Sequence, residues 1–294
     1  MKILETKNLS KRYGLNYAVD KVSMTIHEGD IYGFIGENGA GKTTFIRLVS
    51  GLIEKDNGSS LLFEGQNHHI GAVVETPSLY LYLSAMDNLM AQGMMLGKVD
   101  VERHKELLKL VKLDYLIGSK KKAKDFSLGM RQRLGIAMAL LSNPKFLLLD
   151  EPMNGLDPEG VVLMRNLIKR LNEEGITFLI SSHMLSELSK VASRYGFIHK
   201  GKLIKEITFE ELEHLNKPYI SIRLETEELR KAENLLKASN FNYKIDNLTL
   251  TIYDQTVTDI VLLLAKENII VKTIHQETSA IENYYLNLIG GLYA

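Results

Sequence analysis

The sequence predicts an α/β protein whose sheet is interrupted by a helical insertion and followed by a small α+β domain. Three apolar runs, at residues 31–35, 146–149 and 176–180, are each followed by a polar or glycine-rich turn and a helical pattern, which indicates buried strands of a parallel or mixed sheet. A shorter run at 72–74 has the same character. Residues 84–142 are instead rich in Leu, Met, Lys and Glu at helical spacing. The predicted sheet is therefore built from segments far apart in the chain.

The end of the chain has a different pattern. Ile220, Ile222 and Leu224 alternate as in a strand, and a hairpin is expected around Asp246-Asn247. With the helical spacing between and after these segments, the order becomes β-α-β-β-α-β-α. This order predicts a ferredoxin-like domain. We expect a first domain at 1–215 and this α+β domain at 216–294.

Length and composition agree with two globular domains. The chain has 294 residues, of which 45% are hydrophobic and 24% charged, and a domain usually takes ~100–200 residues. Lys and Arg together number 36, as do Asp and Glu, so the formal net charge is 0. This balance argues against nucleic-acid binding over the whole surface, because phosphate contacts need a basic excess. It leaves room for one local phosphate site.

The sequence also argues against several kinds of site and against a membrane-spanning or secreted protein. The chain has no cysteine, which excludes disulfides, thiolate metal sites and cysteine nucleophiles. No run approaches the ~18 apolar residues that span a bilayer, and the N-terminus has no apolar signal-peptide core. We expect a cytoplasmic protein that meets the inner face of a membrane only through a partner chain.

A phosphate-binding loop follows the first apolar run. Residues 36–43 read GENGAGKT and match G-x-x-x-x-G-K-[ST] between a predicted strand and a helix, a context that disfavours a chance glycine turn. The glycines let several N–H groups point at one anion, and the helix N-terminus adds a favourable dipole. Lys42 is expected to contact the β- and γ-phosphates, and Thr43 to ligate Mg²⁺. The residues expected to bind a nucleoside triphosphate here are Asn38, Gly39, Ala40, Gly41, Lys42, Thr43 and Thr44.

Polar residues directly follow the other predicted strands. They are Glu75, the pair Asp150-Glu151, and the run Ser181-Ser182-His183. Ligands of open α/β sheets bind beyond the carboxyl ends of the strands, so adjacent parallel strands would place these side chains around one γ-phosphate. We expect Asp150 to hold Mg²⁺, Glu151 to act as general base on the attacking water, and His183 to bind the γ-phosphate.

Over roughly residues 1–205 the sequence resembles the ATP-binding-cassette (ABC) ATPases. Tyr13, in KRYG, matches the aromatic residue that stacks on adenine. The other motifs, in chain order, look like the signature (FSLGMRQRLGIAMALL, 126–141), the Walker B with its catalytic glutamate (LLLDEP, 147–152), the D-loop (NGLD, 154–157) and the switch histidine (SSH, 181–183). The resemblance implies a P-loop ABC ATPase core with a helical subdomain at about 76–142.

The resemblance also implies a mechanism and partners. Two cassettes, identical or different, would pair head to tail, with each ATP between the phosphate loop of one and the signature of the other. Ser127 and Gly129 would contact the γ-phosphate bound to the second cassette, and Asp157 would cross the interface. The helical subdomain would carry the motion of ATP binding and hydrolysis to a transmembrane permease.

The sequence departs from the family pattern at two motifs. Glu75 stands where most members have a Gln that helps ligate Mg²⁺, and we expect a harder ligand there and an effect on the nearby water. The alternative is that Glu75 points away and the alignment is shifted. In the signature, Leu128 replaces a Gly and Met130 replaces a Gln. Leu128 is tolerable if its φ is negative, which would preserve the contacts of Ser127 and Gly129.

These departures together resemble one branch of the family. The segment HIGAVVETPSLYLYLSAMDNL (69–89), with SLGMRQRLGIAMALL, looks like the exporters of bacitracin and lantibiotic peptides, in which a permease is a separate chain. This implies an ATPase subunit that gives resistance or self-immunity. Alternatives are a cassette for a drug, a lipid or a toxin peptide, a soluble ABC ATPase of DNA repair or translation, and a nucleotide sensor. Glu151 and His183 argue against the sensor, and the chain lacks the coiled-coil insertion or second cassette usual in the soluble forms.

Two further surface features stand in the helical subdomain. Lys120-Lys121-Lys122 and Lys124 form a basic run before the signature. A solvated loop is the favoured interpretation, and attraction to lipid headgroups is the alternative. The family resemblance implies that the permease contacts the region of Tyr80 and Tyr82, beside a cluster of methionines, and this contact is a hypothesis.

Overall fold

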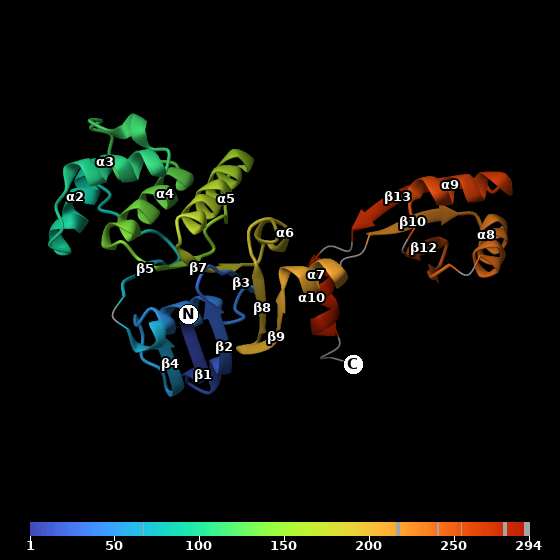
Figure 1. The fold of residues 1–294 in the computed structure, drawn as a ribbon, viewed down its shortest axis with the longest axis horizontal. Helices are drawn as coiled ribbons and strands as arrows, with labels where there is room; N and C mark the ends of the chain where they lie inside the picture. Colours follow the sequence, from blue (N-terminus) through green and yellow to red (C-terminus); the bar gives the residue numbers. More distant parts are fainter. Residues whose placement is uncertain (67, 216–217, 240, 254, 279–280, 291–294) are drawn as a thin grey trace. The chain divides into compact units, whose positions relative to one another are not determined.

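The computed structural model describes residues 1–66, 68–215, 218–239, 241–253, 255–278 and 281–290. It divides the chain into two compact units, Met1–Phe209 and Glu210–Ala294 (Figure 1). The division falls at the start of α7 (Phe209–Leu215), whereas the sequence placed it after residue 215. Within the described residues, no helix combines the length and apolar character needed to cross a bilayer.

A six-stranded sheet forms the centre of the first unit. Its strand order is β5-β6-β7-β3-β8-β9. Neighbours from β5 to β8 pair in parallel, and β9 pairs antiparallel with β8. The strands are β3 (Ile31–Ile35), β5 (Ile70–Val73), β6 (Phe146–Asp150), β7 (Thr177–Ser182), β8 (Arg194–His199) and β9 (Lys202–Thr208). Every residue of β3, β6 and β7 is buried, as in a parallel sheet covered on both faces. The predicted parallel sheet is confirmed.

An antiparallel sheet of order β2-β1-β4 packs beside it. Its strands are β1 (Lys2–Tyr13), β2 (Asn16–His27) and β4 (Asn57–Leu62), followed by the short helix η1 (Phe63–Gly65). One buried cluster joins residues of this sheet, of the large sheet and of α1 (Lys42–Val49). The ring centres of Phe45 in α1 and Phe34 in β3 are 4.9 Å apart. This packing fixes the helix that follows the phosphate loop.

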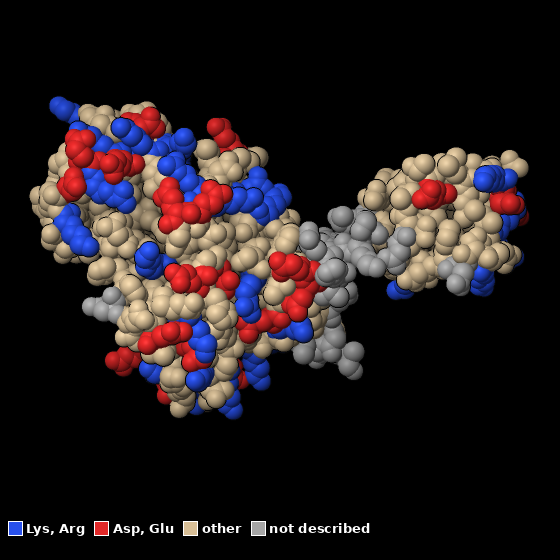
Figure 2. Space-filling view, viewed as in Figure 1, with Lys and Arg blue, Asp and Glu red and all other residues tan. Residues whose placement is uncertain are grey.

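Helices cover the other side of the large sheet (Figure 1). The expected helical insertion is confirmed between β5 and β6. It contains α2 (Ala85–Met95), α3 (Val101–Leu110) and α4 (Leu128–Ala139), with the short helices η2 (Asp114–Leu116), η3 (Ala123–Asp125) and η4 (Leu140–Ser142). After β6 come α5 (Pro158–Glu173) and, after β7, α6 (Leu185–Leu188). Acidic and basic side chains are interspersed over the visible face of this unit (Figure 2), in keeping with the net charge of 0.

The second unit has the predicted order of elements. They are β10 (Pro218–Leu224), α8 (Thr226–Ala238), β11 (Tyr243–Asp246), β12 (Thr249–Tyr253), α9 (Val257–Lys266), β13 (Val271–Thr278) and α10 (Ile281–Gly290). The sheet order is β11-β12-β10-β13, with every pair antiparallel. Ile222 and Leu250 lie opposite each other in register and are fully buried against the helices. This is the arrangement of a ferredoxin-like domain.

Candidate nucleotide-binding site

The phosphate loop joins β3 to α1 through two left-handed glycines. Gly39 and Gly41 have φ of +81° and +107°, which residues with a side chain rarely adopt. A Cβ atom on Gly41 would also overlap the carbonyl oxygen of Ala18. A second chain segment braces the loop, because the N–H of Gly201 donates to the carbonyl of Ala40 at 2.9 Å. The loop is therefore held open by backbone conformation and packing.

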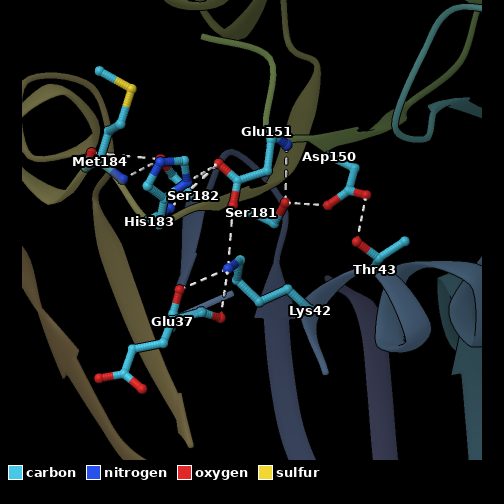
Figure 3. Close-up of polar contacts among 10 residues, drawn as sticks. Glu37, Lys42, Thr43, Asp150, Glu151, Ser181, Ser182, His183 and Met184 are labelled. Carbon is cyan, nitrogen blue, oxygen red and sulfur yellow. Dashed lines mark hydrogen bonds and ion pairs between the residues drawn. The ribbon is translucent and has the colours of Figure 1, made fainter. Parts of the chain in front are cut away.

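Lys42 points into the space framed by this loop (Figure 3). Its side chain is buried, and its Nζ donates to the carbonyl oxygens of Gly36 at 2.6 Å and of Glu37 at 3.1 Å. The same Nζ forms an ion pair with Oε1 of Glu151 at 3.1 Å. A buried ammonium costs free energy unless it is paired with oxygen atoms. Lys42 is thus a preorganised cation that can exchange these contacts for phosphate oxygens.

Thr43 and Asp150 lie together at the start of α1. The Thr43 hydroxyl donates to Oδ2 of Asp150 at 2.8 Å. The Ser181 hydroxyl donates to the other oxygen, Oδ1, of this buried carboxylate. Hydroxyl and carboxylate oxygens fit Mg²⁺, which is usually held by one or two carboxylates together with substrate phosphates and water. The described residues contain no cluster of three or more His, Cys, Asp or Glu that would hold a metal without such a substrate.

Glu151 lies between a cation and a histidine. Its Oε2 is 2.8 Å from Nδ1 of His183, while Oε1 faces Lys42. The backbone of Glu151 is left-handed, with φ of +50°, a strained conformation for a residue with a side chain. Its N–H donates to the Ser181 hydroxyl at 3.0 Å. From the sequence, no separate role was predicted for Ser181, although its position at the end of a strand could have indicated one.

Glu75 makes a contact that the sequence did not suggest. Its Oε1 is 3.0 Å from Nη2 of Arg47 on α1, and both side chains are partly exposed. Glu75 follows β5 closely and has a left-handed φ of +57°. The structure therefore pairs this carboxylate with an arginine, one helical turn after Thr43. Its role as a Mg²⁺ ligand stays a prediction.

The remaining loop residues and Tyr13 are accessible to a ligand in different degrees. Asn38 and Gly39 are exposed, Ala40 is buried, and Thr44 is half-buried. Tyr13 ends β1 and is 52% exposed. Its ring lies 5.8 Å from Nζ of Lys11. An exposed ring of this kind offers a face on which a purine can stack.

The signature and D-loop residues cap two helices of the first unit. The Ser127 hydroxyl caps α4 by accepting from the N–H of Met130 at 3.2 Å. Asp157 caps α5 through the N–H of Gly160 at 2.9 Å. Leu128 is the first residue of α4 and has the negative φ that the sequence required. Within the described part of the chain, the recorded contacts of Ser127, Gly129 and Asp157 do not reach the phosphate loop. The structure therefore leaves them outside the cluster around Lys42.

Comparisons with known proteins identify the family of this chain. Residues 19–154 match the family model described as ABC transporter. The chain is 39% identical to the bacitracin transport ATP-binding protein BcrA of Bacillus licheniformis over 98% of each chain. It is 43% identical to the lantibiotic transport ATP-binding protein SrtF of Streptococcus pyogenes, over 72% of this chain and 94% of that protein.

A solved structure shares the fold of the first unit. The crystal structure of a nucleotide-free ATP-binding cassette from an ABC transporter has a TM-score of 0.65 and 27% identity, and the match covers 73% of this chain and 94% of that one. The resemblance drawn from the motifs is confirmed. The phosphate loop, the carboxylates at the strand ends and a relative that matches 98% of the chain all lead to the same conclusion. The chain belongs to the ABC transporter family, as one of its ATP-binding, ATP-hydrolysing subunits.

Proposed function

We propose that the chain is the ATPase subunit of a bacterial exporter of peptide antibiotics of the bacitracin or lantibiotic type. The observation that carries this proposal is the similarity to BcrA, which extends over 98% of both chains and so includes the second unit. The exporter would work through a separate permease and give resistance or self-immunity. The chain would lie on the cytoplasmic side of the membrane, held there by the permease.

The site suggests how ATP is hydrolysed. The loop N–H groups and Lys42 bind the β- and γ-phosphates, and Lys42 gives up its contact with Glu151 in doing so. Glu151, still beside His183, then accepts a proton from the attacking water. The new bond forms between this water and the γ-phosphorus, and the bond to the β-phosphate oxygen breaks, which yields ADP and phosphate. Positioning and charge stabilisation supply most of the catalysis in such reactions.

Mg²⁺ fits the oxygens of Thr43 and Asp150, which already lie 2.8 Å apart. Thr43 and Asp150 would hold the ion, and its positive charge would offset the negative charge that develops on the phosphates. Glu75 joins this set only if it leaves Arg47, which holds it at 3.0 Å. We therefore propose Thr43 and Asp150 as the resident ligands and Glu75 as a conditional one.

A second cassette and a permease complete the proposed assembly. Ser127, Gly129 and Asp157 lie at or near helix starts. In the described residues their recorded contacts do not reach the phosphate loop of their own chain, which suits contacts to the nucleotide of another cassette, identical or different. A cleft of about 580 Å³ lies between β5 and the helical subdomain, and it is lined by residues that include Arg47, Pro77 and Gly135. We infer that the permease docks at this cleft, close to the pair of Arg47 and Glu75.

The test compares the peptide-antibiotic susceptibility of a host that carries wild type or Glu151→Gln. Glu151→Gln removes the proton acceptor, so we expect the host to become several-fold more sensitive to bacitracin or to particular lantibiotics. Glu173→Gln changes an exposed carboxylate on α5. It is the matched control and should leave susceptibility unchanged. If Glu151→Gln abolishes ATPase activity of the purified protein but changes susceptibility to none of the peptides, the ATPase assignment stands and the peptide substrate is wrong.

A further inference from the structure

A basic run in the helical subdomain lies beside exposed aromatic and aliphatic side chains. Two backbone hydrogen bonds bring the segments together, from the N–H of Ala123 to the carbonyl of Leu83 and from the N–H of Lys124 to the carbonyl of Leu81, both at 2.9 Å. The resulting surface, which we call the basic–aromatic patch, consists of Leu81, Tyr82, Lys120, Lys121 and Lys124. It plays no part in the nucleotide site.

The patch is open to solvent. Tyr82 is 77% exposed and Leu81 47%, and the three lysines are exposed as well. Lys124 holds its Nζ 5.6 Å from the centre of the Tyr82 ring. Among the described residues, none of the three lysines is recorded in an ion pair. These charges are therefore available to a partner.

Lys122, in the same run, is half-buried and close enough to Asp87 to act on the pKa of that carboxyl group. Hydrogen bonds from Ser84 lower the pKa of Asp87, and the charge of Lys122 lowers it further. Asp125 is the exposed acid within the run itself. The unpaired positive charge is thus concentrated on Lys120, Lys121 and Lys124, around an exposed tyrosine.

This chemistry fits a lipid surface better than a protein. Lysine is depleted at protein–protein interfaces, whereas basic residues beside an anionic membrane each gain about 1 kcal/mol. Tyrosine is enriched at the headgroup level, where its ring is buried and its hydroxyl stays hydrated. Leu81 supplies an aliphatic contact at the same place.

We propose that the basic–aromatic patch binds anionic phospholipid headgroups of the membrane that holds the permease. The inference rests on the proposed function, which brings the chain to a membrane. Direct lipid contact would orient the helical subdomain toward the bilayer, in addition to the hold provided by the permease.

The test measures binding of the purified full-length chain to vesicles by sedimentation at low salt. One set of vesicles is phosphatidylcholine alone, and the other contains about one-third phosphatidylglycerol. Wild type should bind the anionic set only, and added salt should weaken this binding. The triple variant Lys120→Gln/Lys121→Gln/Lys124→Gln should bind about 100-fold less, because each lysine contributes about five-fold. Tyr82→Ser should reduce binding several-fold.

The control is the triple variant Lys55→Gln/Lys145→Gln/Lys169→Gln, which removes the same charge from exposed positions elsewhere in the first unit. It should bind nearly as well as wild type. Equal losses in both triple variants, or no preference of wild type for anionic vesicles, would overturn the proposal. So would a patch variant that binds vesicles normally but fails to assemble with the permease, because the partner would then be a protein.

The readouts separate this inference from the proposed function. A chain that hydrolyses ATP and confers resistance but ignores anionic vesicles would refute the lipid contact alone. A chain that binds vesicles through the patch but confers no resistance would keep the lipid contact and refute peptide export.

Discussion

The central sheets of the two units differ in how they are buried. In the first unit, β3, β6 and β7 are buried at every residue. In the second unit, β12 alternates between buried and half-buried residues. A sheet covered on both faces has no room for polar side chains along its strands, so Asp150 and Ser181 gather at the strand ends. The alternating sheet spreads polar residues such as Thr251 along its strands. The residue pattern of this sheet therefore specifies a fold but does not bring polar side chains together into one site.

The strongest test of this contrast is at the strand-end site of the first unit. Lys42→Ala should weaken ATP binding by 30-fold or more, since losing one partner of a buried charge pair costs about 2–5 kcal/mol. Calorimetric titration with ATP measures this. Lys145→Ala, at an exposed position, is the control and should bind normally. Wild-type affinity in Lys42→Ala would show that the loop is not the nucleotide site.

The matching test in the second unit concerns stability. Leu250→Ala removes a fully buried side chain of β12 and should lower the free energy of unfolding of this unit by about 2–5 kcal/mol. ATP affinity should not change. Scanning calorimetry with and without ATP follows both properties, and Thr251→Ala, on the other face of β12, should cost about 1 kcal/mol or less. A loss of ATP binding in Leu250→Ala would show that the two units are energetically coupled.

A smaller effect is expected at the edge of the first sheet. The exposed pair of Arg47 and Glu75 is worth about 0–1 kcal/mol, so Arg47→Gln should release Glu75 without unfolding the protein. If Glu75 can ligate Mg²⁺, Arg47→Gln should shift the Mg²⁺ dependence of ATPase activity to lower concentration by a few-fold. Glu75→Gln should still bind ATP but alter the Mg²⁺ dependence or the turnover. Identical metal titrations for both variants and wild type would remove Glu75 from the site.

A pH-dependent effect is expected at a buried histidine in the helical subdomain. His104 is fully buried, and neither ring nitrogen has a hydrogen-bond partner in the described structure. Burial lowers the pKa of His104 below its ordinary value of 6.5, and Asp100 opposes this only in part. The unfolded chain therefore binds the proton more readily, and the stabilising effect of the neutral ring is complete above pH 6.5 and is lost as pH falls below it.

His104→Phe should remove this acid sensitivity. Wild type should lose stability below pH 6.5 by at most about 1.4 kcal/mol per pH unit, and the variant should lose less. Denaturant unfolding at about pH 5 and pH 7.5 measures the difference, with the exposed His69→Gln as control. Equal acid losses in His104→Phe and wild type would contradict the assignment.

Local patterns predicted much of the fold and part of the site. The strand at 31–35 agrees with β3 because an apolar run between turn signals is a local property. The order of the last seven elements was readable for the same reason. The contact of Glu75 could not be predicted in this way. Its partner Arg47 lies on another element, and nothing in either segment specifies the pairing.

By itself, the sequence determined the phosphate loop, since the left-handed backbone at Gly41 depends on the type of residue at that one position. It also determined which residues stand at strand ends. Only the tertiary structure decided that Glu151 faces Lys42, that Ser181 joins Asp150 to the backbone of Glu151, and that a lysine run lies beside Tyr82. Each of these contacts joins segments from distant parts of the chain. Their meeting depends on strand order and packing, which residue spacing along one segment does not encode.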